Sequence, residues 1–141
     1  METINIFRAQ HAEQADVALG STQTLMFMYD HAPGEGSRYH YEYEEEWLLV
    51  VAGTVVLRTP DGEQTLEPGD LVRFPAGPTG AHQVTNRSDS TARTLMFSNA
   101  RSPGVVVYPD SDTIGVFFAD EANDTVYRRS TAVPWAYGME G

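Results

Sequence analysis

The sequence contains no cysteine among its 141 residues. This absence excludes thiol nucleophiles, thiolate metal ligands and disulfide bonds, so any metal ion must be held by nitrogen and oxygen atoms. Positive charge is also scarce, because 9 basic residues stand against 20 acidic ones and give a formal net charge of -11. Such a balance disfavours contact with the phosphates of DNA or RNA. We therefore expect no nucleic-acid partner.

Long hydrophobic runs are missing as well. The longest apolar run, Trp47–Gly53, falls far short of the ~20 residues that span a bilayer. Charged side chains, among them Glu2, Arg8 and Asp16, interrupt the first twenty residues, so this region lacks the apolar stretch of a signal peptide. These absences predict a soluble, cytoplasmic protein with no membrane partner.

Sustained helical periodicity is absent from almost every part of the chain. Short segments rich in β-branched, aromatic or aliphatic residues recur instead, separated by Gly, Pro, Asp, Asn and Ser, which is typical of strands joined by turns. A short helix is predicted only over Glu13–Gly20. The predicted strands are Gln23–Tyr29, Trp47–Val51, Thr54–Thr59, Gln64–Leu66, Leu71–Phe74, His82–Asn86, Thr94–Ser98, Val105–Tyr108 and Ile114–Phe118.

Many short strands without intervening helices predict an all-β sandwich or small barrel. The length of the chain suits one domain, assigned here to residues 1–141, with an N-terminal arm over about 1–22 and a C-terminal arm over about 119–141. Val133, Trp135 and Tyr137 indicate that the C-terminal arm packs on something, as an extra edge strand or a dimer contact. A barrel of eight strands has an interior wide enough for one small ligand.

Acidic residues are concentrated at Glu42, Glu44, Glu45 and Glu46. Most such runs are solvated faces, and we keep that interpretation for Glu44 and Glu45. Together with His40 and His82, however, Glu42 and Glu46 offer the two imidazoles and two carboxylates that suit a divalent metal ion.

Spacing along the chain adds a geometric constraint on this candidate site. In a straight strand Glu42 and Glu46 would lie about 13 Å apart, too far to share one ion whose bonds are ~2 Å long. The chain is therefore predicted to turn near residues 43–45, so that His40 and Glu42 end one strand and Glu46 begins its neighbour.

The segment from Gly34 to Gly53 resembles the first motif of the cupin superfamily. Its pattern is a glycine, five residues, His40-x-Glu42, three residues, Glu46, six residues and a glycine. The family pattern has a histidine where this chain has Glu42. The second motif is also similar, with Gly69, a Pro-x-Gly unit, a histidine and an asparagine in order; its members are Gly69, Pro75, Gly77, His82 and Asn86. Four residues separate Gly77 from His82, where the family has two.

The resemblance, which covers about residues 34–86, implies a double-stranded β-helix, or jelly-roll barrel, with a metal in its mouth. It implies His40, Glu46 and His82 as ligands, and Glu42 takes the position of the remaining one. A second carboxylate favours manganese, iron(II) or zinc over copper, and cupins with altered ligands can be metal-free. The resemblance also implies an RmlC-like protein and, together with the apolar tail residues Val133, Trp135 and Tyr137, a homodimer.

Each candidate ligand also has a structural interpretation. His40 can be a half-exposed strand residue, His82 a core histidine, and Glu42 a solvent-facing carboxylate. His11 and His31 match no motif position, and we predict that both lie on the surface. The candidate pocket residues are Tyr29, Arg38, Tyr41 and Phe74, because small-ligand sites are apolar with a few polar groups.

The leading hypothesis is a small cupin that binds a divalent metal ion and acts on an unidentified small molecule. If it is an enzyme, the metal would act as a Lewis acid or activate oxygen, which leaves isomerase, dioxygenase, decarboxylase and lyase activities open. The alternative is a non-catalytic module that binds a small ligand, with or without metal.

Overall fold

The computed structural model describes residues 3–8, 19–99 and 101–139. Within these ranges the chain is built of antiparallel strands, as the sequence predicts, and four single turns of 3-10 helix. The strands are β1 (Thr24–His31), β2 (Tyr41–Glu42), β3 (Glu46–Ala52), β4 (Val55–Thr59), β5 (Gly62–Leu66), β6 (Leu71–Phe74), β7 (Gln83–Thr85), β8 (Ala92–Asn99), β9 (Gly104–Tyr108), β10 (Thr113–Phe117) and β11 (Thr125–Arg128). The 3-10 turns are η1 (Pro78–Gly80), η2 (Pro109–Ser111), η3 (Glu121–Asn123) and η4 (Arg129–Thr131).

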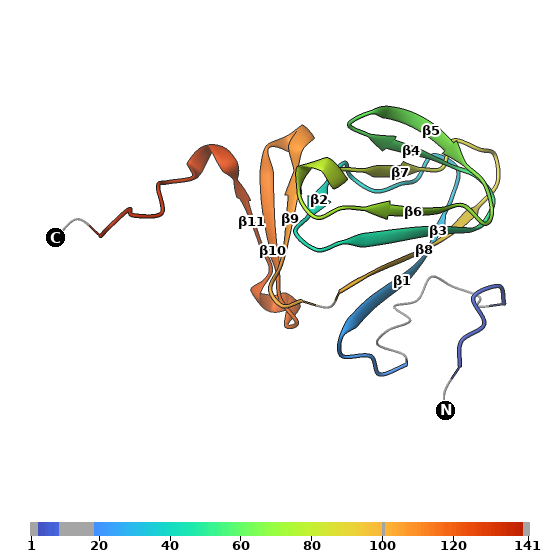
Figure 1. Ribbon diagram of the computed structural model, residues 1–141, viewed down its shortest axis with the longest axis horizontal. Coiled ribbons are helices and arrows are strands. Elements are labelled where there is room, and N and C mark those ends of the chain that lie inside the picture. The colour runs from blue at the N-terminus through green and yellow to red at the C-terminus, as the bar shows by residue number, and fades with distance from the viewer. Residues whose placement is uncertain (1–2, 9–18, 100, 140–141) are drawn as a thin grey trace.

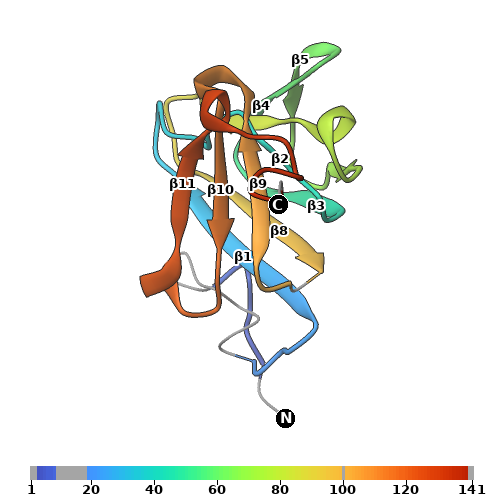
Figure 2. The ribbon, with the colours of Figure 1, turned by 90° about the vertical axis from the view of Figure 1, so that its left-hand side faces the viewer.

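Three sheets form the body of the molecule (Figure 1). Their strand orders are β1-β8-β3-β6, β11-β10-β9-β2 and β5-β4-β7, and every strand pairing is antiparallel. Figure 2 shows β9, β10 and β11 side by side as a separate wall at one end of the body. This architecture confirms the predicted all-β, jelly-roll class.

Period-2 patterning of β3 places alternate side chains inside the body. Its burial alternates from Glu46 through Leu48 to Val50, each of which is buried, while Trp47 and Leu49 are less covered. Alternation of this kind is what a strand with one interior face produces. The hydrophobic core lies beyond Glu46 and consists of Leu48, Val50, Val55, Leu57, Leu66, Phe74, Val84 and Ala92.

A hairpin turn at Pro60-Asp61-Gly62 joins β4 to β5, whose register pairs Thr59 with Gly62. Gly62 has a φ of 126°, a backbone conformation that only glycine adopts without strain. The turn predicted near residues 43–45 is also present. It does not join two neighbouring strands, however, because β2 pairs with β9 whereas β3 pairs with β6 and β8.

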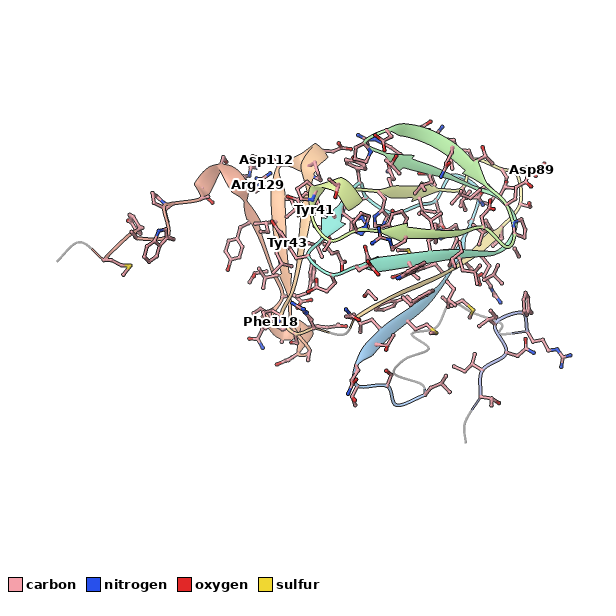
Figure 3. The ribbon with its side chains drawn as sticks, in the orientation of Figure 1. Tyr41, Tyr43, Asp89, Asp112, Phe118 and Arg129 are labelled. Carbon is pink, nitrogen blue, oxygen red and sulfur yellow. The ribbon has the colours of Figure 1, made fainter. Side chains whose placement is uncertain are left out.

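Both predicted arms are only partly described. The helix predicted over Glu13–Gly20 lies outside the described residues except for Leu19 and Gly20, which form a turn. On the C-terminal side, β11 adds the predicted extra edge strand, and the chain then runs away from the sheets (Figure 1). Trp135, 87% exposed, and Tyr137, 74% exposed, are largely uncovered by the part of the chain that the structure describes. Arg129 and Asp112, 3.9 Å apart, lie at the end of the β10–β11 hairpin where this segment departs (Figure 3).

No helix in the parts of the chain that the structure describes is long and apolar enough to cross a membrane.

Candidate metal centre

The two motif histidines lie directly opposite each other although 42 positions separate His40 from His82. They form an isolated antiparallel bridge in which the His40 N–H donates to the His82 carbonyl (3.0 Å) and the His82 N–H donates to the His40 carbonyl (2.8 Å). Their imidazole ring centroids are 4.5 Å apart. Backbone pairing therefore places both rings at one point inside the body.

A backbone carbonyl oxygen lies within hydrogen-bond distance of the Nδ1 atom of each imidazole ring. The His40 Nδ1 lies 2.8 Å from the Arg38 carbonyl oxygen, and the His82 Nδ1 lies 2.9 Å from the Gly80 carbonyl oxygen. Because a carbonyl can only accept, each Nδ1 carries the proton and each Nε2 keeps a free lone pair. This is the tautomer that a histidine metal ligand needs.

The 3-10 turn η1 accounts for the longer spacing between Gly77 and His82. Its last residue, Gly80, supplies the carbonyl that fixes the His82 ring. A Cβ atom on Gly80 would collide with the Pro75 carbonyl oxygen, so the chain can make this tight turn only with glycine there. The two additional residues thus form the turn whose carbonyl orients the ring of His82, a candidate ligand.

Glu46 completes a group of three candidate ligands. One oxygen or nitrogen atom from each of His40, Glu46 and His82 lies within 4.8 Å of the others. The Glu46 Oε2 is 3.6 Å from the His82 Nε2, a buried atom without a hydrogen-bond partner. Phe74 stacks on the His82 ring, with centroids 3.7 Å apart, and closes it off from the core side.

Burial dominates the electrostatics of this group. It lowers the pKa of His82 to about 4, with repulsion from His40 as the second cause, and it lowers the pKa of His40. Burial, together with the nearby carboxylates of Glu42 and Glu44, raises the pKa of Glu46 to about 8. Without a cation the buried site therefore favours neutral imidazoles and a protonated Glu46.

Three further glutamates on the same segment have different environments. Glu42 lies on the wall of the cavity described below, and burial together with Glu44 raises its pKa to about 7. Glu44 is 9% exposed, so its prediction as a solvated turn residue was wrong; its Oε1 lies 3.5 Å from the Arg101 Nε, which draws the turn against that segment. Glu45 points outward and pairs with Arg73 at 2.6 Å.

A cavity of about 700 Å³ opens beside the three candidate metal ligands. The volume is that of a site for a small molecule. Its wall combines alternate residues of β1, residues of β8 and the loop before β2. The lining residues are Leu25, Phe27, Tyr29, Asp30, His31, Gly34, Glu35, Gly36, Ser37, His40, Glu42, Glu46, Val84, Met96, Phe97 and Ser98.

Comparison with known proteins identifies the family. A family model for the cupin domain matches residues 27–98, which contain all four predicted metal ligands. The chain belongs to the cupin family. A search of curated proteins gave no match.

Two solved cupin-like structures illustrate the relationship. A cupin-superfamily sugar phosphate isomerase from Silicibacter pomeroyi DSS-3 is 29% identical, with 89% of this chain and 80% of that chain covered and a TM-score of 0.78. A structure from Acidithiobacillus ferrooxidans ATCC 23270 is 22% identical, covers 87% and 78% of the two chains, and has a TM-score of 0.77.

The polyketide cyclase RemF from Streptomyces resistomycificus is more distant, at 18% identity, coverages of 74% and 83%, and a TM-score of 0.59. At the identities of the last two structures the likeness shows the cupin fold alone.

The donor set of this cupin fits a divalent metal ion. Two neutral imidazole nitrogens and one carboxylate oxygen are ligands of zinc, manganese and iron(II). The unpartnered Nε2 of His82 is the strongest sign, since a buried nitrogen without a partner is costly unless something binds it. Three protein ligands also leave coordination positions open to water or substrate.

The remaining predicted site residues are placed as follows. Glu42 lines the cavity but is not a member of the three-residue group. Tyr29 lines the cavity too. Arg38 lies over the Tyr108 ring instead, at 3.6 Å, and is not among the lining residues. Neither is Phe74, which lies behind His82, nor Tyr41, which is buried near Tyr43 on the side that faces the β9–β11 wall (Figure 3).

Sequence reasoning missed several cavity residues. The surface prediction for His31 was wrong, because it is half-buried on the cavity wall with its Nε2 2.9 Å from the Thr94 Oγ1. His11 lies outside the described residues. Phe27 and Ser98 were not singled out at all. The available signal was the alternation of Leu25, Phe27, Tyr29 and His31, which are spaced to share one face of a strand.

Proposed function

We propose that this cupin is a metal-dependent enzyme that moves a proton between adjacent carbons of a small hydroxycarbonyl compound, an isomerase-type reaction. The observation that carries the proposal is the position of Glu42. Glu42 is a second carboxylate facing the cavity beside His40, Glu46 and His82, but it is outside the group that can share one ion. The site thus offers a ligand set and a separate proton carrier.

His40, Glu46 and His82 would hold the ion, which is manganese, iron(II) or zinc on the basis of the donor atoms. A divalent ion there supplies Lewis-acid polarisation of a substrate carbonyl and stabilises the negative charge that develops on its oxygen. The backbone carbonyls of Arg38 and Gly80 keep both imidazoles oriented. Metal ligands held by such hydrogen bonds need little rearrangement on binding.

Glu42 would act as the general base. Its carboxylate takes a proton from the hydroxyl-bearing carbon next to the carbonyl, the electron pair forms a carbon–carbon double bond, and the carbonyl oxygen gains a proton. Glu42, whose proton exchanges with water, then gives a proton to the neighbouring carbon while the other oxygen loses its proton to water, so that atoms and electrons balance and no oxidant is needed. A carboxylate in reach of the cavity but not bound to the ion is what this transfer requires.

The relative with 29% identity supports this reaction class, because that protein is named a sugar phosphate isomerase. Its likeness extends over most of both chains. We take from this name the type of reaction and not the identity of the substrate.

Two measurements test the proposal. Elemental analysis of untagged protein should find one divalent ion per chain, and Glu46→Ala and His82→Ala should lose it. Deuterium uptake into dihydroxyacetone and 2-hydroxyacetophenone, followed by NMR in D2O, should then require both the metal and Glu42.

The Glu42→Gln variant shows whether Glu42 acts as a general base or as a metal ligand. We expect this variant to keep its metal and to lose exchange activity by about 10²- to 10⁴-fold. Glu45→Gln, an exposed carboxylate three residues away, is the matched control and should behave like the natural protein. Loss of the metal in Glu42→Gln would show that Glu42 is a ligand. Metal binding without any exchange would favour the non-catalytic binding module.

A further inference from the structure

Part of the cavity wall is a ladder of rings on β1, which lies two strands from Glu46 in the same sheet. Phe27 and Tyr29 stack with centroids 5.8 Å apart and planes 15° apart, and Tyr29 is followed by His31 at 6.0 Å. All three line the cavity. Tyr29 is 40% exposed even though the strand packs tightly on its other face, where Met28 is 2% exposed. The open aromatic surface therefore faces the cavity.

The register of the sheet sets the span between the ladder and the ligands. Leu25 pairs with Ser98 and Ser98 pairs with Glu46, while Phe27 pairs with Met96 in the adjacent interior row. β1 therefore lies two strand spacings from β3, about 10 Å at ~4.8 Å per spacing. Phe27 and Tyr29 lie further along β1 than Leu25, so a molecule that touches both the candidate ligands and a ring must extend across β8, as a hydroxyketone attached to a six-membered ring can.

The charge of the cavity excludes anionic groups. All nine basic residues of the chain are arginines, none of them lies outside the described residues, and none lines the cavity. Glu35, Glu42 and Glu46 face it instead, and Asp30, also on the wall, pairs with Arg93 at 2.6 Å. A phosphate dianion placed here would meet carboxylates without a guanidinium or ammonium partner, which is unfavourable in a partly buried site.

From the ring ladder, the span and the charge, we infer that the substrate is an uncharged hydroxycarbonyl compound carrying an aromatic ring, and not a phosphorylated sugar. Its two oxygens would face His40, Glu46 and His82, and its ring would lie against Phe27 and Tyr29. Offset stacking of this kind adds to the gain from burying the ring. The inference rests on the proposed function and differs from it in naming the substrate class.

Three probes that share the HOCH2–CO– unit test whether the site prefers an aromatic ring, a small uncharged group or a phosphate. They are 2-hydroxyacetophenone, which carries a phenyl group, dihydroxyacetone, which is small and uncharged, and dihydroxyacetone phosphate, a dianion. Binding to the metal-loaded protein is measured by calorimetry at pH 7.5. We expect 2-hydroxyacetophenone to bind at least about tenfold more tightly than dihydroxyacetone, and dihydroxyacetone phosphate to bind most weakly of the three.

Phe27→Leu removes the ring and keeps an apolar side chain. It should reduce the preference for the phenyl probe about tenfold and leave dihydroxyacetone binding unchanged. Phe117→Leu, a half-buried aromatic of β10 that does not line the cavity, is the matched control and should keep the preference. Unchanged metal content and circular dichroism show that both variants are folded.

The outcomes for substrate class and for catalysis are distinct. Tightest binding of dihydroxyacetone phosphate, equal binding of all three probes, or no binding of the phenyl probe would each overturn the inference, whatever the exchange assay shows. The predicted order of affinities without deuterium uptake into any probe would uphold the substrate class and overturn the isomerase proposal.

Discussion

The interior of this cupin has two halves that share the strand β3. At one end Glu46 and His40 face a cavity, and the buried Nε2 of His82 beside them has no partner. At the other end Leu48 and Val50 belong to the hydrophobic core. Burying a side chain of that kind is worth ~1.5–3 kcal/mol. The packed half can thus offset the unfavourable burial of polar groups in the open half.

The carboxylates show the same contrast at the scale of neighbouring residues. Glu45 points outward, pairs with Arg73 and accepts a hydrogen bond from the Trp47 indole, and these contacts lower its pKa. Glu46 points inward, where burial raises its pKa. Adjacent positions on a strand face opposite sides, so one residue along the chain changes a solvated ion pair into a candidate ligand.

Leu57→Ala tests the packed half and should have the largest effect on stability. Leu57 is fully buried, and the cavity left by truncation should lower the free energy of unfolding by about 2–5 kcal/mol. Urea denaturation measures the loss. Metal stoichiometry should stay unchanged, and its loss would show that the two halves are not independent.

Metal addition tests the open half. An ion that binds only the folded state at 100 times its dissociation constant should stabilise the metal-free protein by about 2.7 kcal/mol. Thermal unfolding with and without added Mn²⁺ or Zn²⁺ measures the shift. Leu57→Ala should retain the stabilisation, whereas His82→Ala should not respond. An equal response of His82→Ala would place the ion elsewhere.

The pH dependence of the metal-free protein provides a third test. Between about pH 6.5 and 8 the folded state keeps a proton on Glu46 that the unfolded state has released, so the free energy of unfolding should fall as pH rises, by up to ~1.4 kcal/mol per pH unit for one proton. Glu42 adds to this decline up to about pH 7. Below about pH 6.5 the lowered pKa of His82 acts in the opposite direction, because the unfolded state then binds the additional proton.

Glu46→Gln should flatten this decline, and Glu45→Gln should not. Urea denaturation at pH 6.5, 7.25 and 8 in the presence of a chelator provides the measurement. A stability that rises over this interval in the natural protein would contradict the assigned environment of Glu46.

The C-terminal segment offers the smallest expected effect on stability and a test of the predicted homodimer. Trp135 and Tyr137 are the most exposed aromatic residues after β11, so replacing both with alanine should leave the monomer's unfolding free energy within about 0.5 kcal/mol. Light scattering should give twice 15.6 kDa for the natural protein and a lower mass for the double variant. A monomeric mass for the natural protein would reject the dimer.

Much of the fold could be predicted because alternation and turn residues are local signals. The nine predicted strands all correspond to observed ones, and Leu71–Phe74 matches β6 at both ends. Pairing was harder to predict. The turn near residues 43–45 was correct, but the sheet to which each flanking strand belongs depends on contacts with β6, β8 and β9, which come from distant parts of the chain.

The candidate site, like the fold, could be predicted from the sequence only in part. The motif spacing brought His40, Glu46 and His82 into one hypothesis, and the structure groups these three residues. It leaves Glu42 on the wall, buries Glu44 and places Arg38 over Tyr108. Nothing in the spacing carries this information, because the orientation of a side chain near a turn depends on what packs against it.

The sequence by itself determined the all-β class, the nitrogen and oxygen chemistry of any metal site, and the residues able to form it, since these follow from composition and short-range pattern. Only the tertiary structure decided the free Nε2 of each histidine, the separation of Glu42 from the candidate ligand group, and the placement of the β1 rings on the wall of the same cavity. These depend on which backbone carbonyls and neighbouring strands the fold brings to one place, and pairing between distant segments fixes them.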